Sequence, residues 1–187
     1  MLNKILLNFR YAFRPRKPLL VLRLIVTYFS IIFLCRKPFR YVDLAIGYAC
    51  NLKCEHCFAT ALENNSRRKI TPEEFREVAR AAMALGAVNF SFQGGEPTIY
   101  PELLEFVKNT FPEKNLISVT TNATLIDKEM MRDFKRAGVD ILTISIDSAI
   151  PHEHDRFRGV KGSFEKTMSA IKLARKMGLN VTLGAVA

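Results

Sequence analysis

Strand-like and helix-like segments alternate along this chain from Tyr41 to its last residue, and this alternation restricts the fold more than any other feature. Three times a helix-like segment ends in a glycine and a strand-like run follows directly, at Leu85-Gly86, Ala137-Gly138 and Met177-Gly178. Short connections that recur in this way are typical of parallel βα units. The sequence therefore predicts an α/β fold, a partial (βα) barrel of the TIM type with about five βα units.

Turn and capping residues give the limits of these units. Strands are expected at residues 42–48, 88–93, 117–121, 141–146 and 181–186. The first helix of the barrel should begin after Thr71, because Thr71, Pro72 and Glu74 form a capping-box pattern, and it should stop at Gly86.

Three more helices are expected, from about residue 101, over 127–138 and over 163–178. The last of them carries Phe164, Met168 and Ile171 at helical spacing, which predicts that these three side chains form its buried face. The segment 151–162 is interpreted as a loop, with its two histidines, His152 and His154, solvated or bonded to nearby polar groups.

The strands alternate between polar and apolar residues, although parallel strands buried on both faces usually read as continuous Val, Ile and Leu. The polar positions are Asn89, Ser91, Gln93, Ser118, Thr120, Asn122, Thr143, Ser145 and Asp147. Since the apolar face must lie against the helices, the polar face should line the barrel interior. Buried hydroxyls and amides without partners would each cost about 1 to 3 kcal/mol, so the interior is expected to be a cavity for a polar ligand.

Three of the four cysteines lie close together, as Cys50, Cys54 and Cys57 after the first expected strand. Three thiolates can bind one soft metal centre and leave a further coordination position open, as chemistry at a metal requires. A zinc site completed by His56 or by a distant histidine is the alternative, whereas a disulfide framework is not expected. The fourth cysteine, Cys35, lies in an apolar run and is expected to be a buried, unreactive thiol.

Other polar groups follow the ends of the next three strands. They are Gly94-Gly95-Glu96, Thr120-Thr121-Asn122 and Ser145-Ile146-Asp147. A βα barrel brings the carboxyl ends of its strands together, so these segments should lie beside the three cysteines. Two adjacent glycines also let the backbone approach a ligand closely, although a simple turn would explain them as well.

The positive charge is concentrated before the barrel, in a basic and apolar leader over residues 1–41. Residues 1–42 hold nine Lys or Arg and no Asp or Glu, while the rest of the chain holds 28 − 9 = 19 basic against 18 acidic residues. The apolar run 19–35 is short for a membrane span and contains Arg23. Two readings stay open: a helix on an anionic membrane surface, or a helix packed on the domain or on a missing C-terminal part. Nucleic acid is not an expected partner.

From residue 42 onward the chain resembles the core domain of the radical S-adenosylmethionine (SAM) superfamily. The resemblance rests on the C-x3-C-x2-C spacing of the cysteines and on Gly94-Gly95-Glu96. Ser145-Ile146-Asp147-Ser148, His154-Asp155, Arg158-Gly159 and Gly162-Ser163-Phe164 are similar to members with a SPASM-type C-terminal extension. Residues 42–187 therefore look like the first five βα units of a longer core, cut after its fifth strand.

The resemblance also implies a site. Cys50, Cys54 and Cys57 would bind a [4Fe–4S] cluster, and SAM would bind at the remaining iron. The other implied positions are Gly94, Gly95 and Glu96 at the methionyl amino group, Ser145 and Asp147 near the ribose and carboxylate, Arg158 at the carboxylate, and His56 near the adenine. Asn122, at the end of the third strand, is a further candidate for cofactor binding.

The expected function is reductive cleavage of SAM to a 5′-deoxyadenosyl radical that abstracts hydrogen from an unidentified substrate, such as a peptide or a cofactor precursor. The cofactors carry this chemistry, so no catalytic side chain is expected. An electron donor such as flavodoxin or ferredoxin would be needed. The expected location of the protein is the cytoplasm, at the membrane surface if the leader binds there. The alternative is a non-catalytic iron–sulfur or zinc-binding scaffold module.

Overall fold

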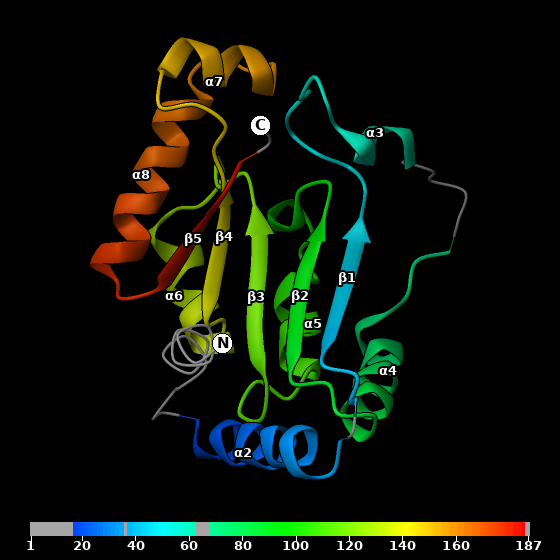
Figure 1. The fold of residues 1–187 in the computed structure, drawn as a ribbon. Coiled ribbons are helices and arrows are strands. Elements are labelled where there is room, and N and C mark those ends of the chain that lie inside the picture. The colour runs from blue at the N-terminus through cyan, green and yellow to red at the C-terminus, as the bar shows by residue number, and fades with distance from the viewer. Residues whose placement is uncertain (1–16, 36, 63–67, 186–187) are drawn as a thin grey trace.

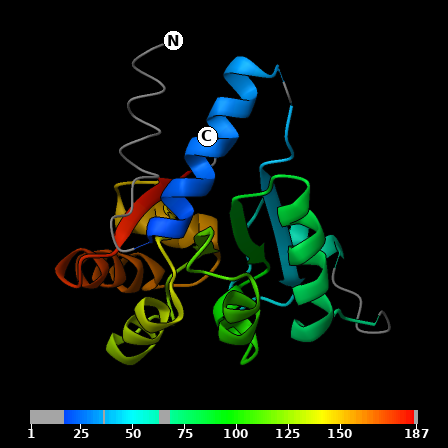
Figure 2. The same ribbon diagram turned by 90° about the horizontal axis from the view of Figure 1, so that it is seen from below.

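The computed structural model describes residues 17–35, 37–62 and 68–185. One sheet holds five parallel strands in chain order: β1 (Tyr41–Gly47), β2 (Asn89–Gly94), β3 (Leu116–Thr121), β4 (Ile141–Ser145) and β5 (Asn180–Gly184). Helices α4 (Pro72–Ala84), α5 (Leu103–Asn109), α6 (Lys128–Ala137) and α8 (Ser163–Lys176) connect the strands and cover one face of the sheet (Figures 1 and 2). Strands in chain order with helices on one face form part of a βα barrel, as predicted.

The apolar residues of the strands face the helices. Phe90, Phe92, Val119 and Leu142 are fully buried. Phe75 of α4 packs edge-on against the rings of Phe90, Phe92 and Phe106, with centroids 5.8 to 6.5 Å apart. The alternation in the sequence therefore identified the core face of the sheet correctly.

Two of the predicted helix boundaries are confirmed by their capping bonds. In α4 the Glu74 N–H donates to Thr71 Oγ1 at 3.2 Å, and the Thr71 N–H donates to Glu74 Oε2 at 3.0 Å. The Asp127 side chain accepts from the Met130 N–H at the start of α6. Gly138 ends α6 with a φ of 92°, a conformation that favours glycine.

The predicted buried face of α8 is wrong by one residue, or about 100° around the helix. Its buried residues are Ser163, Thr167, Ala170 and Ala174, while Phe164, Met168 and Ile171 are only half-buried. Small side chains allow the helix axis to lie close to the sheet, and the larger neighbours pack at the sides of the contact.

The expectation that Cys35 is buried is also wrong, because this thiol is exposed. It lies after helix α2 (Pro18–Phe33), and most of the apolar run that contains it faces away from the core.

Helix α2 forms most of the described part of the leader, and it packs on the domain. It runs across the N-terminal ends of the strands, at the bottom of the sheet in Figure 1 and across the view in Figure 2. Leu20 is its one fully buried residue. Within residues 17–35, 37–62 and 68–185, no helix is long and apolar enough to cross a membrane.

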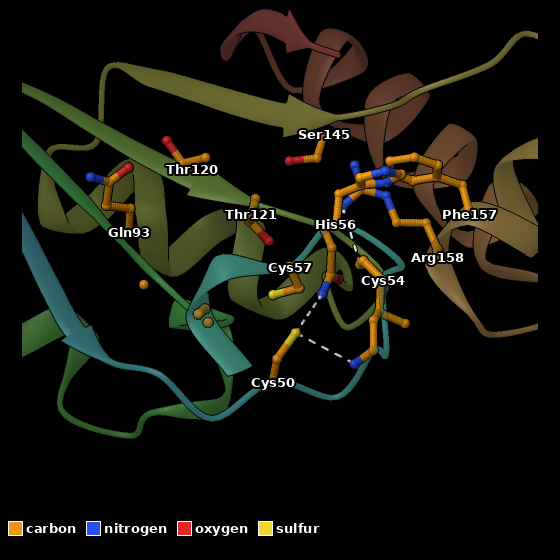
Figure 3. A pocket seen from close by; sticks show the side chains of 15 residues that line it. Cys50, Cys54, His56, Cys57, Gln93, Thr120, Thr121, Ser145, Phe157 and Arg158 are labelled. Carbon is orange, nitrogen blue, oxygen red and sulfur yellow. Dashed lines mark hydrogen bonds between the residues drawn. The ribbon is translucent and has the colours of Figure 1, made fainter. Parts of the chain in front are cut away.

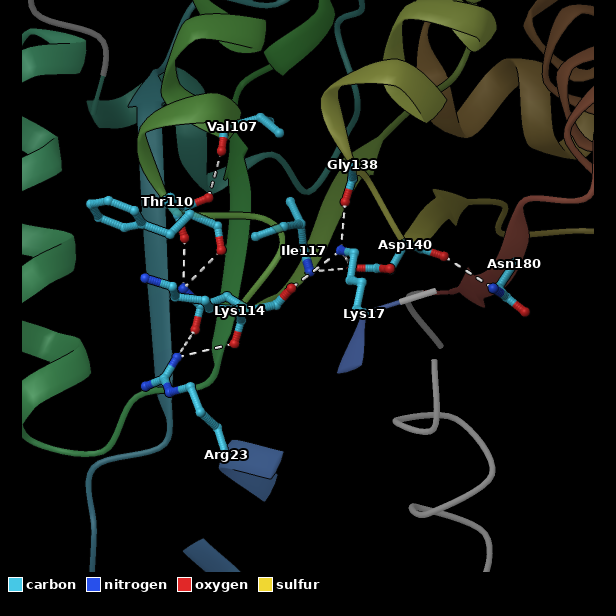
Figure 4. A network of polar contacts seen from close by, with 11 residues as sticks. Lys17, Arg23, Val107, Thr110, Lys114, Ile117, Gly138, Asp140 and Asn180 are labelled. Carbon is cyan, nitrogen blue, oxygen red and sulfur yellow. Dashed lines mark hydrogen bonds and ion pairs between the residues drawn. The ribbon is translucent and has the colours of Figure 1, made fainter. Parts of the chain in front are cut away.

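Two basic side chains attach this helix to the barrel (Figure 4). Lys17 Nζ lies 2.5 Å from Asp140 Oδ2 and donates to the Gly138 carbonyl at 2.9 Å. Arg23 donates to the carbonyls of Ala87 at 2.7 Å and Lys114 at 3.1 Å, and also to Asn115 Oδ1. The arginine that interrupts the apolar run therefore points into the domain.

We expect Arg23→Met to lower the free energy of unfolding by about 2 kcal/mol. The substitution keeps the apolar stem but leaves half-buried carbonyl oxygens without their donor, and such losses cost about 1 to 3 kcal/mol. Urea unfolding measures the effect. Arg175→Met, at an exposed position in α8, is the control and should unfold like the wild type. Equal unfolding midpoints for the two variants would contradict the role assigned to Arg23.

Candidate functional site

The three clustered cysteines lie on the loop between β1 and α3 (Phe58–Leu62), and each thiol is half-buried. They line one pocket at the C-terminal edge of the sheet (Figure 3). The rest of the lining includes Gly94, Gly95, Asn122, Ser145, His56 and Arg158. The structure thus brings together nine of the eleven residues predicted for the site.

Gln93, Thr120 and Ser145 extend the same pocket along the polar face of the sheet (Figure 3). All three side chains come from positions that the sequence assigned to the barrel interior. The wall opposite the cysteines therefore offers amide and hydroxyl groups to a polar ligand.

Nitrogen donors point at two of the sulfurs. Cys50 Sγ accepts from the Leu52 N–H at 3.4 Å and from Asn122 Nδ2 at 3.8 Å, and Cys54 Sγ accepts from Arg158 Nη1 at 3.6 Å. Such bonds stabilise thiolates and tune the potential of an iron–sulfur cluster. The donor set, three thiols of which two accept from N–H groups, suits a soft metal centre.

The thiols share the pocket without converging on one point. In the part of the chain that the structure describes, no three Cys, His, Asp or Glu side chains form a group that could hold a metal ion. Burial raises the pKa of the Cys50 thiol, the Leu52 N–H opposes that rise, and negative charges on Glu96, Cys54 and Cys57 add to it. Three thiolates in one pocket repel one another, so a bound cation would lower the free energy of the deprotonated loop.

Helix α7 (Pro151–Arg158) holds the cysteine loop from the other side. The N–H groups of Lys53 and Glu55 donate to the carbonyls of Arg158 and Phe157, at 3.2 and 3.0 Å. The rings of His56 and Phe157 stack with centroids 5.2 Å apart. The last carbonyls of α7 are therefore used to fix the backbone around Cys54.

The loop predicted at 151–162 is wrong in its first half, because residues 151–158 form α7. Pro151 at the first helical position and Gly159 in the left-handed conformation were the available signals. Phe157 of α7 lines the pocket but was not among the predicted site residues, because its segment was interpreted as a loop. A Cβ on Gly159 would lie 2.4 Å from the Lys53 carbonyl oxygen, so glycine is needed for this close approach.

Asp155 of α7 bonds to the first residues of α8 and so fixes the connection between the two helices. Its carboxylate accepts from the N–H groups of Gly162 at 2.6 Å and Phe164 at 2.8 Å, and from Ser163 Oγ at 2.9 Å. These backbone bonds hold the pKa of Asp155 below its usual value. The carboxylate caps the start of α8 and fixes the position of α7 above it.

Arg158 connects the cysteine loop to the end of β4. Its Nε lies 2.7 Å from Asp147 Oδ2, and both side chains are nearly buried. Asp147 does not line the pocket, because its carboxylate faces Arg158 and α7. Of the two residues, only Arg158 reaches the cavity.

Glu96 also lies outside the pocket lining. It is fully buried, and its two oxygens accept from Thr98, Thr121 and Asn122. Gly94 and Gly95, the two glycines before it, do line the pocket. The groups that come closest to these glycines, however, are backbone carbonyls of the last residue of β1 and of the segment that follows it. A Cβ on Gly95 would lie 2.2 Å from the Ala49 carbonyl oxygen, so even alanine at this position would displace the end of the cysteine loop.

His154 is fully buried in α7, which corrects the prediction of a solvated loop residue. The Asp147 N–H donates to His154 Nδ1 at 3.3 Å, and the ring packs edge-on against Phe164. Burial lowers the pKa of His154, the positive charge of Arg158 lowers it further, and Asp147 and Asp155 oppose this. The imidazole is therefore neutral at pH 7.

We expect the free energy of unfolding to fall as the pH drops below about 6.5, the ordinary pKa of histidine. Below that value the unfolded chain binds a proton at His154 that the folded protein does not, so the contribution present at higher pH is lost. Urea unfolding of wild type and His154→Gln at pH values of about 7.5 and 5.5 measures this. The variant should lose part of the pH dependence, whereas His152→Gln, at an exposed position in α7, should keep all of it. Identical pH dependence in the three proteins would refute the assignment.

A family model described as the radical SAM superfamily matches residues 44–187. Fe-coproporphyrin III synthase of Methanosarcina barkeri is 32% identical over 134 residues, which cover 72% of this chain and 33% of that protein. The subtilosin biosynthesis protein AlbA of Bacillus subtilis is 35% identical over 147 residues, covering 75% of this chain and 32% of AlbA. The chain thus spans about a third of the length of these two relatives.

Solved structures show the same fold. SuiB of Streptococcus suis bound to its precursor peptide SuiA superposes with a TM-score of 0.66 at 23% identity, covering 79% of this chain and 33% of that one. Methylornithine synthase (PylB) gives a TM-score of 0.63 at 18% identity, covering 92% of this chain and 52% of that one.

Proposed function

The chain belongs to the radical SAM superfamily, and from this membership we propose that it forms the catalytic core of an enzyme that uses a [4Fe–4S] cluster and SAM. The observation that carries the proposal is that three thiols, two glycines and the polar ends of the strands line one pocket. When bound, the cluster and SAM supply hydrogen abstraction by a 5′-deoxyadenosyl radical. The residues of the chain hold the cofactors, orient the substrate and exclude water.

Cys50, Cys54 and Cys57 are the proposed cluster ligands. Their thiols must be deprotonated to bind iron, and N–H groups of Leu52, Asn122 and Arg158 donate to two of the three sulfurs. The bonds from α7 to Lys53 and Glu55 keep this loop in place before any metal binds.

The proposed SAM-binding groups lie around the same pocket. Gly94 and Gly95 present unshielded backbone to it, and Ser145 adds a hydroxyl. Arg158 offers a positive charge for the SAM carboxylate and is held in position by Asp147. His56, stacked on Phe157, provides a flat surface for the adenine.

Glu96 and Asp147 act through other residues in this proposal. Glu96 fixes the backbone of Asn122, and Asp147 fixes the guanidinium of Arg158. Neither carboxylate is needed at the reacting atoms.

A peptide or a cofactor precursor is the proposed substrate class. Named relatives include a bacteriocin biosynthesis protein and an Fe-coproporphyrin III synthase, and SuiB binds a precursor peptide. A one-electron donor such as flavodoxin or ferredoxin would serve the cluster. The proposed location is the cytoplasm, where thiols stay reduced, at the surface of an anionic membrane.

Anaerobic reconstitution with iron and sulfide tests the proposal. We expect a brown protein with about four irons that, after reduction, converts SAM to 5′-deoxyadenosine and methionine, detected by chromatography. A colourless protein loaded with zinc would favour the scaffold module instead. A brown protein that neither binds nor cleaves SAM would exclude the enzymatic function while leaving the cluster.

A further inference from the structure

The side of α2 that faces away from the domain is apolar throughout. All the exposed residues of this helix are apolar, and six of them are between 54% and 68% exposed: Leu22, Ile25, Val26, Phe29, Ile32 and Phe33. We call these six residues the outer face of α2. The rings of Phe29 and Phe33 lie next to each other on it, with centroids 4.7 Å apart.

The polar residues of α2 all lie on the other side. Arg23, Thr27, Tyr28 and Ser30 are half-buried, and Arg23 is bonded to the loops of the barrel. A surface helix of a soluble protein normally has the opposite arrangement, with its polar side in water. A continuous exposed apolar surface of this kind marks a contact with a membrane or a protein.

Charge favours a membrane of anionic lipids over a second copy of the chain. Residues 1–42 hold nine basic groups and no acidic one. Lys17 and Arg23 are bonded to the domain, whereas Lys37 and Arg40, which follow α2, are exposed. This part of the chain offers a second copy positive side chains and no acidic partner for them. Anionic headgroups attract such groups, by about 1 kcal/mol for each Lys or Arg near the surface.

We infer that the outer face of α2 docks on the surface of an anionic membrane, with its apolar side chains in the interface between headgroups and acyl chains. The loop between β1 and α3, which carries the three cysteines, lies at the opposite end of the strands from α2 (Figure 1). Strands of this length separate the two ends by about 20 Å. The cysteine pocket at that end therefore lies on the side of the domain away from the bilayer, where a substrate reaches it from the water.

Co-sedimentation of the full chain with vesicles tests the docking. We expect binding to vesicles of phosphatidylglycerol and phosphatidylcholine to be about tenfold tighter than to phosphatidylcholine alone, and to weaken as salt is raised. The double variant Phe29→Gln/Phe33→Gln should bind about tenfold more weakly than the wild type. The matched control Val78→Gln/Leu125→Gln removes two exposed apolar side chains elsewhere and should bind like the wild type.

The chain contains no tryptophan, so a single inserted one reports the orientation. Fluorescence of Phe29→Trp should be quenched by vesicles with brominated acyl chains, whereas that of Leu125→Trp, at the pocket end of β3, should not. This measurement remains decisive if the double variant fails to fold.

Three results would overturn the inference: no binding to either vesicle at low salt, equal quenching of the two tryptophans, or wild-type binding by the double variant. Loss of a wild-type dimer in the double variant, without vesicle binding in either protein, would show that a second copy covers the outer face. Vesicle binding needs neither cluster nor SAM. Its failure would therefore leave the proposed function untouched, and failure of the proposed function would leave the docking untouched.

Discussion

Replacement of Cys54 by alanine is expected to remove most of the iron that the chain takes up during anaerobic reconstitution. A [4Fe–4S] cluster held by three cysteines depends on each of them, and two thiolates cannot hold it well. The wild type should contain about four irons and the variant less than about one. Iron and sulfide analysis together with visible absorbance measures the difference.

Cys54 is the sharpest choice because its loop is held by other groups. The N–H groups of Lys53 and Glu55 keep their bonds to the carbonyls of α7 whatever side chain lies between them. Alanine therefore removes a ligand while the backbone stays in place, so a loss of iron reports ligation directly.

Cys35→Ala is the matched control, since Cys35 is exposed beyond the end of α2, away from the pocket. This variant should keep all of its iron. Full iron in Cys54→Ala, or an equal loss in the two variants, would show that the three clustered cysteines are not the ligands.

The sequence predicts the barrel well because its signals are local. The alternation of Phe90 and Phe92 with Ser91 and Gln93 records which face of β2 meets the helices. The bonds around Thr71 and Asp127 form within one helical turn. Neither signal depends on residues far along the chain.

Features that depend on distant residues were less predictable. Arg23 reads as an interruption of an apolar run, and only the fold brings it to the carbonyls of Ala87 and Lys114. The short charged segment of α7 resembles a loop, yet its last carbonyls meet a cysteine loop about a hundred residues earlier in the chain.

The sequence predicted which residues gather at the candidate site better than it predicted which of their side chains face the pocket. The three cysteines and the glycines line one pocket as expected. The carboxylates of Glu96 and Asp147 instead face protein groups, because partners from neighbouring loops surround them. Counting polar residues at strand ends cannot separate a side chain that reaches a ligand from one that supports it.

Glu96 offers the second large effect, since we expect Glu96→Gln to lower the free energy of unfolding by about 2 to 3 kcal/mol. Its Oε1 accepts from the N–H and hydroxyl of Thr98, at 3.1 and 2.6 Å, and from Thr121 Oγ1 at 2.7 Å. Its Oε2 accepts from the Asn122 N–H at 2.7 Å. Glutamine would replace one of these oxygens by an NH2 group that faces a donor, in a place closed to water.

Thermal unfolding measures this loss, and for a chain of this size the midpoint should fall by about 2 to 4 °C for each kcal/mol. Glu105→Gln, at an exposed position in α5, is the matched control and should change the midpoint little. The result separates two roles for Glu96. If its carboxylate only received the SAM amino group, Glu96→Gln would weaken SAM binding and leave the midpoint unchanged. If it supports the backbone of Asn122, the midpoint falls before any cofactor is added, and SAM binding weakens because the pocket wall has moved.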